Sequence, residues 1–185
     1  MKFLGLDSAA TTGWAFQRVE ETANTKHTYW ETGVIRADSP QKYDILEFAK
    51  EHGVTHAVVE KPMPFAGSAA AVGQSMNISY GRWVEACERV GLEVVPALVS
   101  SWQAHMLVIN GKRIQQKQDG DDKAGSKLVA AYHGAAGCGG DESDAVCLCL
   151  YGPVARSREA VKEEAKREAR AAKQKAYREK RRAGK

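Results

Sequence analysis

The segment that decides the fold is FLGLDSAATTGWAF, residues 3–16 of a chain of 185 residues. Its first half is a short apolar run that ends in an acid, so we predict a buried strand at Lys2–Asp7. The small polar residues Thr11–Gly13 then favour a tight turn, and Trp14–Val19 is predicted to be a second strand. We therefore expect the chain to open with a hairpin whose first strand carries a carboxylate, Asp7, at its end.

Signals for helices and strands alternate along the rest of the chain. Apolar and β-branched runs indicate strands, and serine or aspartate before helix-forming residues indicates helix starts. The expected elements are a strand at Thr25–Arg36, a helix starting at Ser39-Pro40 and stopping at Gly53, strands at Val54–Glu60 and Leu92–Ala97, a long helix at Ser68–Val90, a short helix from Ser100 or Ser101 to Ile109, a mobile polar loop at Asn110–Asp121, and helices at Asp122–His133 and Asp141–Gly152. A three-strand meander followed by alternating elements predicts an α/β fold. Its mixed five-stranded sheet would have a three-strand antiparallel meander, two parallel strands and helices on both faces.

Charge divides the chain into two parts. Residues 156–185 contain 13 basic and 5 acidic residues, whereas residues 1–155 contain 14 basic and 18 acidic ones. The last segment also lacks Leu, Ile, Phe, Met and Trp, so it buries too little apolar surface to fold alone. We expect one globular domain at 1–155 and a basic, helical or disordered extension at 156–185. An acidic body with a basic arm is typical of proteins that handle nucleic acid, with a solubilising tail as the alternative.

The apolar runs of this sequence are short. None approaches the ~18 residues that a membrane span requires. The run at the N-terminus is interrupted by Asp7 and is too short for a signal peptide. We therefore expect a soluble, cytoplasmic protein without a membrane partner.

Four acidic side chains lie where a fold of this class would bring them together. Asp7 and Glu60 each end an apolar strand, and open α/β sheets bind ligands at the carboxyl ends of their strands. Asp141 and Asp144 share one face at the start of a helix. Each acid taken alone has a structural interpretation, as a turn former or, for Asp141, as a helix N-cap. Together they repel one another unless cations bind, and Mg²⁺ or Mn²⁺ with oxygen ligands satisfies them best.

The sequence around these acids resembles a known family. FLGLDSAATTGWAF, AVVEKP, VVPALVSSWQ and GDESDAVCLCLYG are similar, in the same order, to segments of the RuvC-like Holliday junction resolvases of the ribonuclease H-like superfamily. The similarity spans roughly residues 2–152. The small size and divergent loops look more like a bacteriophage member than a bacterial one, which would place the protein in the host cytoplasm.

This resemblance implies a ribonuclease H-like nuclease domain with metal-dependent endonuclease activity. Asp7, Glu60, Asp141 and Asp144 would be the catalytic, metal-binding acids, with two Mg²⁺ or Mn²⁺ ions that activate water and stabilise the leaving oxygen of a phosphodiester. The partner would be branched DNA. A homodimer would nick two opposed strands of a four-way junction and leave 5′-phosphate ends that a ligase can seal. No nucleotide cofactor is implied.

The resemblance also implies DNA contacts. Phe65 follows the second acid, where the family has an aromatic wedge; an ordinary core position is the alternative. Lys123 matches a lysine near the scissile phosphate; a solvated charge at a helix start is the alternative. Gln103 stands where the family often has a basic residue, and Trp102 beside it is expected to anchor its helix in the core rather than to stack on a base. The tentative DNA-binding set is Lys61, Phe65, Gln103, Lys112, Arg113 and Lys123.

The long helix at 68–90 has an unusual pattern. It begins with small residues and continues with an apolar set that is too wide for one amphipathic stripe. We expect one part of it to pack on the sheet and another part on a second copy of the chain, as in the dimer helix of the resolvases. Burial within a single subunit is the alternative.

Three other functions stay open at this point. A ribonuclease H-type enzyme, or a nuclease with broad flap and branch activity, would share the fold but act on a different substrate. A non-catalytic junction-binding protein would use the basic arm, but four acids without metals would repel DNA. The segment at residues 5–13 also resembles the first phosphate loop of actin-type ATPases, whose two domains do not fit into 185 residues.

Overall fold

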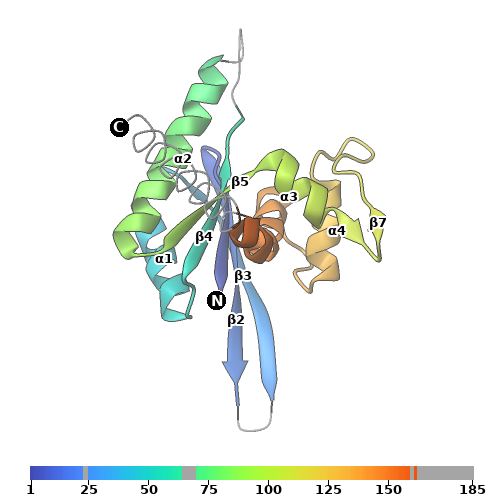
Figure 1. The fold of residues 1–185 in the computed structure, drawn as a ribbon, viewed down its shortest axis with the longest axis horizontal. Helices are drawn as coiled ribbons and strands as arrows, with labels where there is room; N and C mark the ends of the chain where they lie inside the picture. The colour runs from blue at the N-terminus through green and yellow to red at the C-terminus, as the bar shows by residue number, and fades with distance from the viewer. Residues whose placement is uncertain (23–24, 64–69, 159–160, 162–185) are drawn as a thin grey trace, which may run out of the picture. The chain divides into compact units, whose positions relative to one another are not determined.

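The computed structural model describes residues 1–22, 25–63, 70–158 and 161 of the chain. The chain divides into two compact units, residues 1–152 and 153–185. The first unit holds the sheet and the helices that pack on it (Figure 1). Most of the predicted basic extension, 156–185, lies outside the described residues, so its conformation and the domain boundary at residue 155 stay predictions.

A mixed five-stranded sheet forms the centre of the first unit. Its strands are β1 (Phe3–Asp7), β2 (Thr11–Glu21), β3 (Lys26–Arg36), β4 (His56–Lys61) and β5 (Glu93–Leu98). They lie in the order β3-β2-β1-β4-β5. Strands β1, β2 and β3 form an antiparallel meander, and β4 runs parallel to both β1 and β5. The predicted α/β sheet, with its meander and its two parallel strands, is confirmed.

Helices cover both faces of this sheet, as predicted. The elements outside the sheet are α1 (Lys42–Glu51), α2 (Ala70–Val90), α3 (Val99–Met106), β6 (Val108–Ile109), β7 (Lys112–Arg113), α4 (Ala124–Tyr132) and a last helix at residues 140–158. Helices α1 and α2 cover one face, and α4 and residues 140–152 of the last helix lie on the other (Figure 1). None of the helices in the described ranges is long and apolar enough to cross a membrane.

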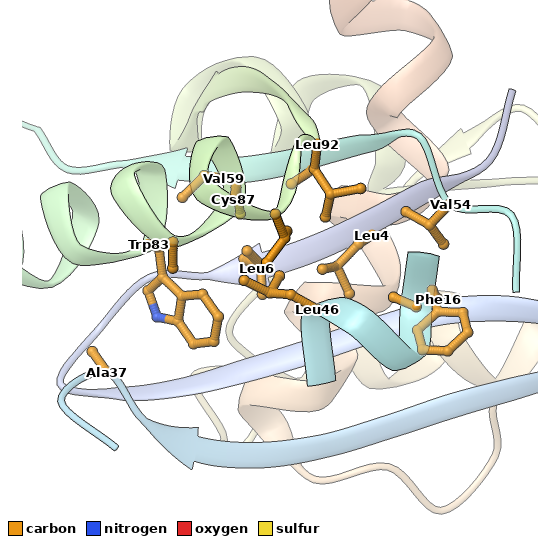
Figure 2. Packing of buried hydrophobic residues seen from close by; sticks show 14 residues of the cluster. Leu4, Leu6, Phe16, Ala37, Leu46, Val54, Val59, Trp83, Cys87 and Leu92 are labelled. Atoms are coloured by element: carbon orange, nitrogen blue, oxygen red, sulfur yellow. The ribbon is translucent and has the colours of Figure 1, made fainter. Parts of the chain in front are cut away.

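The main apolar core lies between the sheet and helices α1 and α2. Figure 2 shows Leu4 and Leu6 of β1 and Val59 of β4 gathered with Leu46 of α1 and Trp83 of α2. All five side chains are fully buried. Burying a large apolar side chain contributes roughly 1.5–3 kcal/mol, so this face supplies much of the folding free energy.

The opposite face of the sheet has glycines that let the last helix come close. A Cβ atom on Gly5 of β1 would overlap the carbonyl oxygen of Ala145, and one on Gly13 of β2 would overlap that of Asp141. Side chains alternate along a strand, so Asp7 lies on the same face of β1 as Gly5. The start of the last helix is therefore held next to the carboxylate at the end of β1.

The first hairpin turns earlier than the sequence suggests. β2 begins at Thr11, so the turn is Ser8–Ala10 and not Thr11–Gly13. The Thr12 hydroxyl donates to the carbonyl of Ala9 (2.8 Å), which closes the turn. Because threonine is β-branched and fits a strand well, these residues extend β2 instead of interrupting it.

Helix α1 begins later than predicted. The predicted N-cap Ser39 and first helical residue Pro40 instead form a turn, in which the main-chain N–H of Lys42 donates to the carbonyl of Ser39 (3.4 Å). The predicted stop at Gly53 is confirmed, because this residue has a φ of 81° that glycine adopts without strain.

The predicted short helix and mobile loop are wrong between residues 107 and 113. α3 starts at Val99, without a serine cap, and ends at Met106. β6 and β7 then pair as a hairpin. Its turn consists of Asn110 and Gly111, which have φ values of 51° and 74°. Asn-Gly is the favoured pair for a two-residue hairpin turn because both positions need a positive φ.

Candidate active site

Asp7 and Glu60 lie at the ends of two neighbouring parallel strands. Leu6 of β1 is in register with Val59 of β4, so the acid that follows each of them lies at the same edge of the sheet. The Ser8 hydroxyl donates to the main-chain carbonyl of Glu60 (2.5 Å) and ties the two strand ends together. Both acids are buried, with 7% and 9% exposure. The structure thus brings the first two predicted acids together.

The last helix brings two more acids to the same edge. Asp144 is buried, whereas the side chain of Asp141 is 40% exposed. The charges of both raise the pKa of Asp7, after the larger effect of burial. Glu142 between them is used differently, since it accepts a hydrogen bond from the Thr32 hydroxyl of β3 (3.0 Å). We refer to Asp7, Glu60, Asp141 and Asp144 as the acid cluster.

One lysine lies among these carboxylates. The Nζ atom of Lys123 lies 3.1 Å from Oδ2 of Asp7, 3.5 Å from Oδ1 of Asp141, and in direct contact with Asp144. Burial opposes its charged form, but the charges of Asp7 and Asp144 outweigh burial and raise the pKa of Lys123. Lys123 is therefore a constant positive charge at the acid cluster and not a solvated charge at a helix start.

Asp144 is held by two side chains to which no sequence motif points. The Ser126 hydroxyl and the Gln116 amide both donate to its Oδ1 atom, the amide at 3.0 Å. Oε1 of Gln116 in turn accepts the main-chain N–H of Ser126 (3.0 Å). Lys123 and Ser126 are three residues apart at the start of α4, so their shared face was available as a signal. The position of Gln116 depends on the path of a loop, which no spacing in the sequence reveals.

Trp102 of α3 holds another acid of the cluster. Its indole N–H donates to Oε2 of Glu60 (2.8 Å). The side chain is 1% exposed, which confirms the predicted core position. An indole has a single donor, so Trp102 fixes one of the two carboxylate oxygens of Glu60.

Negative charge is in excess at this site. Burial, and then the charge of Asp7, raises the pKa of Glu60 to about 8, although the hydrogen bond from Trp102 lowers it. Burial also raises the pKa of Asp7 to about 6, although Lys123 lowers it. Ionised carboxylates are therefore unfavourable here near neutral pH, and further positive charge would stabilise them.

The donor set of the acid cluster fits hard divalent cations. All four side chains are carboxylates, the ligands that Mg²⁺ and Mn²⁺ prefer, and their excess negative charge favours a cation. In the part of the chain that the structure describes, no three Asp, Glu, His or Cys side chains stand at the distances of ligands around one ion. The ammonium of Lys123 lies between the carboxylates instead. The residues that would hold such ions are Asp7, Glu60, Asp141 and Asp144.

Of the tentative DNA contacts, Lys123 lies in the site itself. Lys61 is exposed at the end of β4, and Lys112 and Arg113 are exposed on β7. Gln103 is half-buried in α3. Phe65 lies outside the described residues. Their contacts with DNA stay predictions.

Two solved structures of RuvC from Thermus thermophilus are similar to this chain. One has a TM-score of 0.56 and 17% identity, and the match covers 83% of this chain and 96% of that chain. The other, in complex with a Holliday junction substrate, has a TM-score of 0.55 and 13% identity over the same shares of the two chains. No family model and no curated protein sequence matches the chain. At these identities the similarity is one of fold, and the predicted ribonuclease H-like architecture is confirmed.

Proposed function

We propose that this protein is a divalent-metal-dependent endonuclease that resolves four-way DNA junctions by paired, symmetric nicks. The observation that carries the proposal is the acid cluster around Lys123 at the carboxyl edge of a RuvC-like sheet. The fold alone leaves the chemistry open, because one fold can host unrelated functions. The gathered carboxylates, of which burial raises the pKa of Asp7 and Glu60, support a site for divalent cations, and such a site on this fold suits phosphodiester hydrolysis.

Each residue of the site has a distinct role in this proposal. Two Mg²⁺ or Mn²⁺ ions, when bound, would supply an activated water and stabilise the leaving oxygen. The ammonium of Lys123 is within reach of a phosphate that docks against the acids, and would donate to one of its oxygens. Trp102 and Ser126 hydrogen-bond to Glu60 and Asp144, so these two carboxylates are oriented before DNA arrives.

Branched DNA is the proposed partner, and two copies of the chain form the proposed active unit. RuvC of T. thermophilus, whose fold this chain shares, has been solved with a Holliday junction substrate. Helix α2 leaves Val72 57% exposed, which is apolar surface that a second copy would cover. The exposed Lys61, Lys112 and Arg113 are the proposed contacts to the phosphate backbone, and the basic extension would add salt-sensitive affinity.

The test is incubation of the full chain with a synthetic four-way junction in Mg²⁺ or Mn²⁺. We expect symmetric nicks with 5′-phosphate ends, which disappear in EDTA and in Asp7→Asn. Asp119→Asn is the matched control, because this aspartate lies in a turn with a φ of 48°, a conformation that asparagine also adopts. The absence of cleavage with both metals would overturn the proposal.

Substrate choice separates the proposed activity from the alternatives on the same fold. A flap and an RNA–DNA hybrid of matched length are offered beside the junction. Faster cleavage of the hybrid identifies a ribonuclease H-type enzyme, and equal cleavage of the flap identifies a broad branch nuclease. Tight binding of the junction without cleavage identifies a junction-binding protein that lacks catalysis.

A further inference from the structure

A polar hollow lies beside the β1–β2 turn, which follows Asp7. This pocket of about 180 Å³ is formed by the β1–β2 turn at Ala10, the end of β3 and the exposed side of α2. Its polar lining includes Arg36, Asp38, Ser79 and Arg82. We refer to it as the arginine pocket.

The arginine pocket has a net positive charge. Nε and Nη2 of Arg36 donate to Oδ1 and Oδ2 of Asp38, each at 3.1 Å. This pair orients the guanidinium and leaves three of its five N–H donors for a ligand. Arg82, exposed on α2, adds a second positive charge, so two arginines face one aspartate. The lining therefore attracts anions even though it contains a carboxylate.

A buried hydroxyl completes the set of donors. Ser79 is only 4% exposed, yet its side chain lines the pocket. Its hydroxyl can donate one hydrogen bond to an oxygen of a ligand in the pocket. Two guanidinium groups and a hydroxyl match the oxygens of a phosphate, which arginine engages in a bidentate manner.

The arginine pocket lies close to the acid cluster. Ala10 on its rim is three residues after Asp7, so their Cα atoms are at most about 11 Å apart. The turn between them is tight, since the main-chain N–H of Ala9 donates to the carbonyl of Asp7 (2.9 Å). A DNA strand that reaches the acids therefore passes within a few linkages of the pocket.

We propose that the arginine pocket binds a backbone phosphate of the DNA strand, a few linkages from the cleaved phosphodiester. This inference rests on the proposed nuclease function and adds to it a site on the α2 side of the β1–β2 turn. A phosphate held there fixes the register of the strand on the protein and carries no sequence preference.

The test compares Arg82→Ala with Arg89→Ala. Both arginines are exposed on α2, two helical turns apart, but Arg89 contacts Tyr43 (3.4 Å) and does not line the arginine pocket. Both changes are made in full-length Asp7→Asn, which keeps the junction DNA intact. We expect Arg82→Ala to weaken binding about five- to tenfold at low salt, and to reduce the salt dependence of log K by about 1. Arg89→Ala leaves both quantities unchanged, and Arg82→Lys restores the salt dependence.

Methylphosphonate linkages locate the bound phosphate. Each neutral linkage replaces one phosphate near the nick site, and we expect one or two positions to weaken binding several-fold. At those positions the neutral linkage should not weaken DNA binding by Arg82→Ala any further, because this variant already lacks the contact between Arg82 and the phosphate. If every neutral linkage weakens DNA binding equally in the protein with Arg82 and in Arg82→Ala, the proposal is overturned.

The other outcomes separate this inference from the proposed function. If Arg82→Ala binds DNA as Arg89→Ala does while the wild-type protein still nicks junctions, the arginine pocket is overturned and the nuclease stands. If Arg82→Ala acts only by shifting the oligomeric state in light scattering, the pocket faces a second copy and the inference is wrong. If the wild-type protein neither binds nor cleaves DNA, both proposals are wrong.

Discussion

The two faces of β1 differ most at the end of the strand that carries Asp7. Towards α1 and α2, Leu4 and Leu6 are fully buried in the apolar core (Figure 2). Towards the last helix, Gly5 provides room and Asp7 provides charge. Because side chains alternate along a strand, the five residues of β1 contribute both to the apolar core and to the acid cluster. The apolar face towards α1 and α2 therefore supplies stability, whereas the face towards the last helix combines Phe3 with a carboxylate that the surrounding scaffold keeps beside other acids.

The largest expected effect is that of Glu60→Gln, which changes an acid of the cluster on the neighbouring strand β4. We expect cleavage to fall at least about a thousandfold, equivalent to about 4 kcal/mol in the barrier. At pH 8 and without metal, the same change should stabilise the fold, because it removes a buried carboxylate whose pKa is raised to about 8. Junction cleavage and thermal unfolding in EDTA measure the two effects.

The control for this prediction is Glu47→Gln, at an exposed position of α1. It should change neither cleavage nor the unfolding temperature. A Glu60→Gln protein that is less stable than the wild type in EDTA would show that the carboxylate contributes to the fold, and the contrast between the faces would be lost.

Leu6→Ala and Gly5→Ala change neighbouring residues on opposite faces. Leu6→Ala should cost about 2–5 kcal/mol of unfolding free energy through a cavity, but cleavage per folded molecule should stay close to normal. Gly5→Ala should cost about 1–3 kcal/mol through overlap with the last helix. It should also lower cleavage about tenfold, because the helix carries Asp141 and Asp144. Urea unfolding and cleavage at a temperature where both variants are folded measure these effects. Equal loss of activity in the two would mean that the faces are not independent.

The stability of the metal-free protein should fall as pH rises from about 4.5 to about 8. In this range the folded protein keeps the proton of Glu60, whose pKa is about 8, while the unfolded chain has released it. The folded state therefore loses a few kcal/mol at most, since each unit of pKa shift corresponds to about 1.4 kcal/mol. Urea unfolding in EDTA at several pH values measures the slope. The dependence of the unfolding free energy on pH should be weaker in Glu60→Gln and in Mg²⁺ than in the wild-type protein in EDTA. If Glu60→Gln shows the same dependence as the wild type, Glu60 is not the group responsible.

The smallest expected effect comes from Trp102→Phe, which removes the hydrogen bond to Glu60. That bond lowers the pKa of Glu60, so its loss should shift the acidic limb of the pH–rate profile to higher pH. We expect a several-fold loss of cleavage at pH 7. Trp83→Phe is the matched control on the apolar face, where the indole donates to the Thr12 hydroxyl (2.8 Å). Trp83→Phe should lower the free energy of unfolding by a similar amount without shifting the pH–rate profile. Equal pH–rate profiles in the two variants would contradict the role of Trp102.

The sheet could be predicted because its signals are local. Apolar strands that end in an acid, such as β1 and β4, are visible as short runs, and the order of elements limits how they pair. The β6–β7 hairpin was also local, since Asn110-Gly111 is a strong turn signal, and its omission was an error of interpretation. The start of α1 was wrong because the Ser39-Pro40 signal competes with a turn that uses the same residues.

The amino-acid sequence by itself determined which residues carry the charge and which strands present it. It placed Asp7, Glu60, Asp141 and Asp144 at the ends of predicted elements, and alternation along a strand is a property of the backbone alone. Only the tertiary structure decided which acids Lys123 contacts, and that Trp102 and Gln116 hold Glu60 and Asp144. The physical reason is that a hydrogen bond needs two atoms within about 3 Å, and loops and helix packing, not sequence spacing, set that distance.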